Sequence, residues 1–204
     1  TKLVITLTRD NKLSKLQYEW IRSFIKQNEK LSKEITGLDF ACFEEGHPPH
    51  EKKDFFQRVK EDNKKGRPLE LLYHVGESFE NKSIASAIRW IFEAHKMGAD
   101  RLGHCTALGL DPENNRGDQI NESEEETDQT KVWLLENKEL LLSYGFDVSK
   151  DDLSKPTVYD DKTIERTRLL QKAVLAYFKD KAVTIESCPT SNMRIGKIKK
   201  EEFY

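Results

Sequence analysis

The chain has 204 residues, of which 34 are basic and 36 acidic, so its formal net charge at pH 7 is -2. This balance argues against a nucleic-acid or membrane surface, either of which would need a basic excess. No apolar run approaches the ~18–20 residues that a membrane span requires, and the length fits a single domain of ~100–200 residues. We therefore expect a soluble one-domain protein with neither nucleic acid nor membrane as a partner.

Strand and helix patterns alternate along the chain. β-branched and apolar runs predict strands, and apolar residues at helical spacing predict helices. Ser83 is a candidate N-cap, and Gly98 is a candidate residue for ending the same helix. In chain order, the pattern predicts strand 3–8, helix 11–33, strand 35–43, helix 52–63, strand 69–74, helix 83–97, strand 100–104, helix 163–179 and strand 182–187.

This rhythm predicts an α/β fold with a parallel sheet. Two architectures fit the pattern: an open doubly wound sheet and a (β/α)₈ barrel of the TIM type. No glycine-rich phosphate loop follows the first strand, so the dinucleotide-binding form of the open sheet has little support. In both architectures, polar residues at the C-terminal ends of strands are the functional candidates.

The pattern breaks between residues 113 and 162, which we interpret as a polar insertion between a strand and the next helix. Residues 113–130 are acidic and poor in apolar side chains, which predicts a solvated or mobile loop. The apolar stretches at 132–135 and 140–142 predict helix. The insertion is either a surface excursion without a chemical role or a lid or partner-docking element.

Polar residues end three of the predicted strands, each beside a glycine or proline. His74 and Glu77 follow the third strand with Gly76 between them, and the fourth strand ends at Gly103 and His104. A lone histidine at such a position is more often a packed rim residue than a ligand. Three such ends in succession on one scaffold favour a functional site.

These segments resemble the adenosine and AMP deaminases. That family carries, in order, Gly-x-Asp-Leu-Ala-Gly-x-Glu, His-Ala-Gly-Glu, Ile-Gly-His-Gly and Cys-Pro-x-Ser-Asn. The chain has Gly37-Leu38-Asp39-Phe40-Ala41-Cys42-Phe43-Glu44, His74-Val75-Gly76-Glu77, Leu102-Gly103-His104-Cys105 and Cys188-Pro189-Thr190-Ser191-Asn192. Cysteine stands for the family's glycine at positions 42 and 105. The first exchange puts the exact purine substrate in question, and the second is expected to be tolerated.

The resemblance implies a (β/α)₈ barrel with Zn²⁺ at its C-terminal mouth, and a purine nucleoside as the small-molecule partner. It implies that His74 is a zinc ligand and that Glu77 protonates the purine ring nitrogen. His104 would orient the zinc-bound hydroxide and take its proton. Substrate-binding positions would be Asp39, Cys42 and Gly76, and Gly103 is expected to let His104 come close to the metal.

These residue types suit hydrolytic deamination of adenosine to inosine and ammonia. Zinc lowers the pKa of a bound water to ~7 and so provides a nucleophile. Attack on the aromatic ring requires a proton at the neighbouring ring nitrogen, which a carboxylic acid can deliver. Two alternatives remain: another metal-dependent amidohydrolase, and a non-catalytic module derived from a deaminase.

The resemblance also identifies what is missing. The family takes two zinc ligands from a His-x-His motif on the first barrel strand and an Asp from the last, and the sequence contains neither. The chain also begins at Thr1, directly before a strand. We therefore expect residues 1–204 to be a partial barrel domain that lacks the first and last strands, is inactive alone and exposes apolar sheet edges. A second chain or missing segments would complete the barrel.

The remaining cysteines and histidines have plainer interpretations. Three widely spaced cysteines predict reduced thiols and a cytoplasmic location, and Cys188 is expected to be structural. His47 and His50 are expected to be solvated loop residues. His95 lies near the end of a predicted helix, where a cation would suit the helix dipole.

Overall fold

Five parallel strands form one sheet in the computed structural model, which describes residues 2–79, 81–150 and 157–195. The strands are β1 (Leu3–Leu7), β2 (Ile35–Phe40), β3 (Glu70–Val75), β4 (Arg101–His104) and β5 (Thr184–Glu186). They are hydrogen-bonded in the order β1-β2-β3-β4-β5. A doubly wound sheet reverses its strand order at a switch point, whereas barrel strands follow one another around the axis. The sequential order thus selects the barrel type, of which the described residues form five strands.

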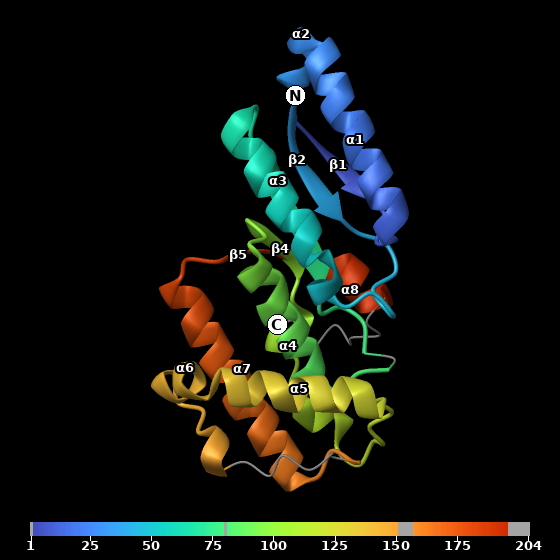
Figure 1. The fold of residues 1–204 in the computed structure, drawn as a ribbon. Helices are drawn as coiled ribbons and strands as arrows, with labels where there is room; N and C mark the ends of the chain where they lie inside the picture. The colour runs from blue at the N-terminus through green and yellow to red at the C-terminus, as the bar shows by residue number, and fades with distance from the viewer. Residues whose placement is uncertain (1, 80, 151–156, 196–204) are drawn as a thin grey trace.

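Helices connect the strands (Figure 1). The connections contain α1 (Asn11–Gln27) and α2 (Glu29–Ser32), then η1 (Pro49–Lys52) and α3 (Lys53–Lys65), then α4 (Ile84–Met97), and finally α7 (Asp161–Asp180). The short helix α8 (Pro189–Ile195) follows β5. No helix among the described residues combines the length and apolar character needed to cross a bilayer.

Local capping explains where α4 begins and ends. The Ser83 hydroxyl accepts a hydrogen bond from the Ser86 N–H at the start of α4, and Gly98 ends the helix with φ of 99°. Both roles match the sequence prediction. Helix 11–33 was predicted as one piece, which is wrong, because the chain leaves helical geometry at Asn28 and only the short α2 follows.

An aromatic cluster between the sheet and α3 fixes which face of the strands is turned toward the helices. Phe40 of β2 is fully buried and contacts Phe55 and Phe56 of α3, with ring centroids 5.1 and 5.8 Å away. Tyr73 of β3 contacts Phe40 and Phe56 at 5.6 and 5.9 Å. Since side chains alternate along a strand, the residues next to Phe40 and Tyr73 point to the opposite face.

The acidic part of the insertion is not a solvated loop throughout, which corrects the sequence prediction. After η3 (Pro112–Asn115), α5 (Glu124–Glu136) begins at Ser123, whose hydroxyl caps the Glu126 N–H. Its first-turn glutamates suit the positive end of the helix dipole. The helix crosses α4 (Figure 1), where buried Arg89 pairs with Glu126. The predicted helix at 140–142 lies in α6 (Lys138–Ser143), η4 (Val148–Lys150) follows, and residues 151–156 lie outside the described residues.

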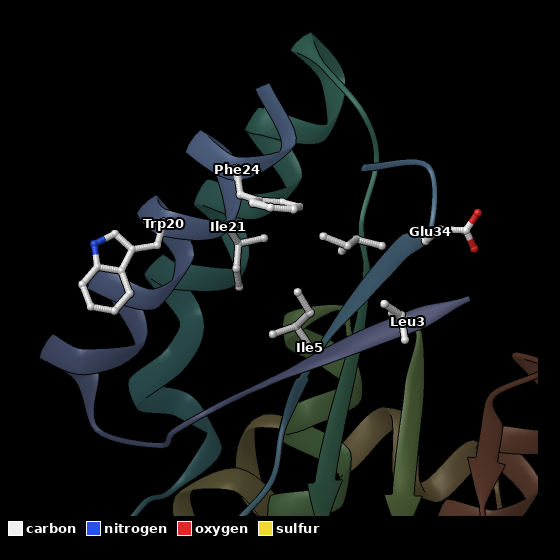
Figure 2. A pocket seen from close by; sticks show the side chains of 7 residues that line it. Leu3, Ile5, Trp20, Ile21, Phe24 and Glu34 are labelled. Carbon is white, nitrogen blue, oxygen red and sulfur yellow. The ribbon is translucent and has the colours of Figure 1, made fainter. Parts of the chain in front are cut away.

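Apolar surface is exposed at both edges of the sheet, as the sequence predicted. Leu3 of β1 is 49% exposed, Ile185 of β5 is 37% exposed, and Trp20 of α1 is 65% exposed. Figure 2 shows Ile21 and Phe24 of α1 on the same side of the groove as Trp20, with Ile5 of β1 opposite. This groove between α1 and β1 has a volume of about 470 Å³ and is lined by Leu3, Ile5, Trp20, Ile21, Phe24, Glu34 and Ile35.

Candidate active site

The predicted site residues gather at the C-terminal ends of β2, β3 and β4. Asp39 and His74 are the neighbours of Phe40 and Tyr73, so they point away from α3, to the face that lies inside a barrel. The strand register sets His74 beside Gly103 of β4. Parallel pairing therefore brings these three positions together, although they are far apart in the sequence.

His74 is held by a carboxylate on the neighbouring strand. Its Nδ1 lies 2.7 Å from Oδ1 of Asp39, and this hydrogen bond raises the pKa of His74 above its usual value. The carboxylate accepts a hydrogen bond from Nδ1–H, so the lone pair of the neutral ring is on Nε2. A carboxylate behind a histidine in this way is the usual arrangement for a metal-binding imidazole. Asp39, which was predicted to contact the substrate, is thus hydrogen-bonded to His74.

Gly103 provides the space for the His74 ring. A Cβ at this position would lie 2.7 Å from Cδ2 and 3.1 Å from Nε2 of His74. The sequence predicted that the small size of Gly103 would make room for His104, which is wrong, because the ring that needs the space is that of His74 on β3.

His104 turns out of the strand at its last residue. Its φ of 67° is in the left-handed region, and its ring centroid lies 4.8 Å from that of His74. The Nε2 atom lies 3.3 Å from Oε2 of Glu77, a close polar contact in which no hydrogen bond is formed. The Nδ1 atom lies 2.8 Å from Nδ2 of Asn192 on α8. His104, Glu77 and Asn192 are all buried.

Glu44 fixes the backbone that carries Glu77. Its buried carboxylate accepts hydrogen bonds from the N–H groups of Gly76, Glu77 and Ser78, at 2.9, 3.2 and 3.3 Å. Burial raises the pKa of Glu44 above its usual value, while the charge of Lys82 acts in the opposite direction. Glu44 belongs to one of the motifs found in the sequence, but no role was predicted for it. Its position just after β2 was the available signal.

The two cysteines at positions 42 and 105, where the resembled family has glycine, both adopt left-handed backbone conformations. Cys42 has φ of 72° and is exposed, and Cys105 has φ of 52° and is buried. Glycine adopts this region without steric cost, whereas other residues are strained there. Burial raises the pKa of the Cys105 thiol, so this side chain is a packed neutral group.

Gly76 is enclosed by protein on each side. Its φ is 74°, its N–H is bound to Glu44, and its carbonyl accepts a hydrogen bond from the N–H of Ala107 at 3.1 Å. A Cβ here would lie 2.5 Å from Cδ1 of Ile91 on α4. The absence of a side chain therefore serves the packing of β3 on α4. Contact of Gly76 with a substrate stays a prediction.

The sequence model of the adenosine deaminase family matches residues 1–203. The chain belongs to the adenosine deaminase family. It is 25% identical over 162 residues to adenosine deaminase 1 of Streptomyces coelicolor, an alignment that covers 79% of this chain and 26% of that protein. It is 38% identical over 72 residues to the adenosine deaminase of Mycobacterium leprae, covering 35% of this chain and 17% of that protein. The chain therefore spans about a quarter or less of these relatives.

A solved structure, the adenine deaminase from Arthrobacter aurescens, is similar to this member of the adenosine deaminase family with a TM-score of 0.43 and 16% identity. The comparison covers 97% of this chain and 37% of the other. The strand order and register described above define the fold independently of this likeness.

The described part of this deaminase-family chain offers one metal-ligating group and not a full set. A catalytic zinc usually has three protein ligands. Within residues 2–79, 81–150 and 157–195, no group of three His, Cys, Asp or Glu side chains gathers to hold a metal ion. His74, with Asp39 behind it, has the bonding pattern of one ligand. The described residues therefore do not by themselves fit a catalytic zinc.

Proposed function

We propose that the whole protein hydrolyses adenosine to inosine and ammonia. The observation that carries the proposal is the convergence of His74, His104 and Glu77 at the C-terminal ends of β3 and β4. Family membership supports a deaminase. The substrate, a 6-aminopurine nucleoside, and the use of Zn²⁺ are parts of the proposal.

Glu77 is the proposed proton donor to the purine ring nitrogen. Its side chain is 11% exposed, and Oε2 has no hydrogen-bond partner among the described residues. Its backbone is anchored by Glu44. A carboxyl group that is fixed in place and still has an uncommitted oxygen is suited to hand a proton to a bound ring. An acid that was fully engaged with the protein would first have to break a contact.

His74 is the proposed contribution of this chain to a zinc site. A bound zinc ion would supply a hydroxide nucleophile at neutral pH. The further ligands would come from outside the described residues, and His104 would be placed beside the reacting groups by its contact with Glu77. The isolated chain is accordingly proposed to be inactive.

We further propose that a second chain, or further segments of the same protein, complete the barrel. The groove between α1 and β1 supports this proposal, because it is almost wholly apolar and leaves Trp20 and Phe24 exposed. Large apolar patches on a protein surface mark sites of association. A cytoplasmic location is also part of the proposal, supported by the free thiols of Cys42, Cys105 and Cys188.

The test is ammonia release by the whole protein from adenosine, with AMP and adenine as competing substrates. Glu77→Gln removes the proton donor and is expected to lower the rate at least about 100-fold. Glu70→Gln is the matched control, since Glu70 lies on the same strand with a side chain that is 61% exposed. Undiminished activity of Glu77→Gln would refute the assigned role. Absence of ammonia release from any purine would favour a non-catalytic module or a different amidohydrolase.

A further inference from the structure

Asn192 lies directly behind His104, and no role was assigned to it from the sequence. It belongs to α8, its side chain is fully buried, and Nδ2 lies 2.8 Å from Nδ1 of His104. Its amide oxygen has no hydrogen-bond partner among the described residues. A buried amide normally satisfies both of its ends. The contact with His104 satisfies the nitrogen end of this amide.

The contact determines which nitrogen of His104 carries the proton. An amide nitrogen can only donate, so Nδ1 of His104 must present its lone pair, and the proton of the neutral ring is then on Nε2. The Nε2 atom faces Oε2 of Glu77 at 3.3 Å. Glu77 in its ionised form, before it gains the proton that it is proposed to deliver, can only accept at this oxygen, so it favours the same tautomer from the other side of the ring.

The reversed arrangement is electrostatically worse. If the amide oxygen of Asn192 faced His104, the proton would lie on Nδ1 and the lone pair of Nε2 would point at the oxygen of Glu77. Two acceptors would then face each other at a buried site, where an unmatched polar contact is costly. The geometry therefore selects one tautomer for His104, and it is opposite to that of His74, whose proton is on Nδ1 beside Asp39.

We propose that Asn192 is a positioning residue that holds His104 with its proton on Nε2. His104 then offers a hydrogen-bond donor to the reacting groups, instead of the proton acceptor expected from the family resemblance. This inference deepens the proposed deaminase function and rests on it for its chemical meaning. Its physical content, the tautomer, can be measured without any catalytic assay.

The experiment uses the 204-residue chain labelled with ¹⁵N at histidine, and long-range ¹H–¹⁵N correlation spectra taken at one fixed neutral pH. In the wild-type chain, Nε2 of His104 is expected at the shift of a protonated nitrogen and Nδ1 at that of an unprotonated nitrogen. The opposite pattern, or a mixture of both, overturns the proposal. This measurement decides the matter even if no variant folds.

Asn192→Asp provides the second test. Aspartate can only accept at the position where the amide donates, so Nδ1 of His104 is expected to gain a proton in this variant. Asn114→Asp, the same exchange at an exposed position of η3, should leave the His104 spectrum unchanged. An unchanged spectrum in Asn192→Asp overturns the proposal. If the tautomer is as stated but the whole protein releases no ammonia, the deaminase function fails and the positioning role stands.

Discussion

Replacing Gly103 by alanine tests whether the pairing of β3 and β4 is built around the His74 ring. The new Cβ would lie 2.7, 3.0 and 3.1 Å from Cδ2, Cγ and Nε2 of that ring. Favourable carbon contacts lie at about 3.5–4.0 Å, so the overlap amounts to roughly half an ångström or more at three atoms. The backbone φ of Gly103 gives alanine no difficulty, because it is an ordinary strand position.

The expected loss of stability depends on which atoms must move to make room for the added methyl group. Forcing an extra methyl group into a packed site typically costs about 1–3 kcal/mol. The ring can retreat only by weakening its 2.7 Å hydrogen bond to Asp39. A hydrogen bond to a charged group contributes about 1.5–3 kcal/mol, so the two routes cost similar amounts. We expect Gly103→Ala to lower the free energy of unfolding by about 1–3 kcal/mol.

Urea unfolding followed by circular dichroism measures this cost, and a double-mutant cycle with His74→Ala isolates its cause. Without the ring, the added methyl group has space, so the cost of Gly103→Ala in the His74→Ala background should fall to within about 0.5 kcal/mol of zero. Gly66→Ala is the matched control, since the nearest atom to a Cβ there is 3.7 Å away. An equal cost of Gly103→Ala in both backgrounds would refute the reasoning.

Three further predictions concern other parts of the chain. Glu44→Gln should destabilise the fold by about 1–3 kcal/mol in urea unfolding, because an amide cannot accept all three backbone hydrogen bonds; an unchanged midpoint would contradict this. Burial lowers the pKa of His95 below 6.5, so the unfolded chain binds more protons and the free energy of unfolding should fall as the pH drops below about 6.5. His95→Gln should flatten that dependence relative to wild type, and an unaltered pH profile would count against it. Trp20→Glu should reduce self-association in sedimentation velocity more than Leu13→Glu does. Leu13 is an exposed residue of the same helix outside the groove. Equal effects of both variants would argue against the groove as the surface of association.

The sequence predicted the sheet well because its signals are local. Each described strand lies within a few residues of a predicted one, since buried parallel strands appear as short apolar runs. It could not choose between the open sheet and the barrel by periodicity alone, because that choice depends on strand order. The error at α5 has a similar origin. The first half of that helix is polar and gains its stability from capping at Ser123 and from Arg89 of α4, a residue 37 positions from its partner Glu126.

His95 shows the same limit within a correctly predicted helix. Its place near the end of α4 suggested a cation that the helix dipole would favour. In the fold the ring packs against Tyr177 and Phe178 of α7, with centroids 5.7 and 5.2 Å away, and burial lowers its pKa. The dipole acts within one helix, whereas the aromatic neighbours come from a distant segment. The burial of the ring among these aromatic side chains lowers the pKa of His95 and outweighs the effect of the helix dipole.

Strand ends and motifs in the sequence identified the site residues, but they did not predict the contacts between these residues. Asp39 and His74 were predicted to be near a common ligand, whereas their direct hydrogen bond depends on the register of β2 and β3. Asn192 reaches His104 only because α8 folds back after β5. Such contacts join segments with no sequence relation to each other, so no local pattern could predict them.

The backbone is strained at three positions just after β2 and at the end of β4. Cys42, His104 and Cys105 all adopt positive φ, which costs non-glycine residues roughly 1–2 kcal/mol each. Such conformations persist only where the surroundings determine them, and they gather at functional sites. At His104 the surroundings are identifiable, with Asn192 on one side of the ring and Glu77 on the other. A purely structural strand end could use glycine and avoid this cost. The strained backbone at this position therefore supports the role proposed for His104.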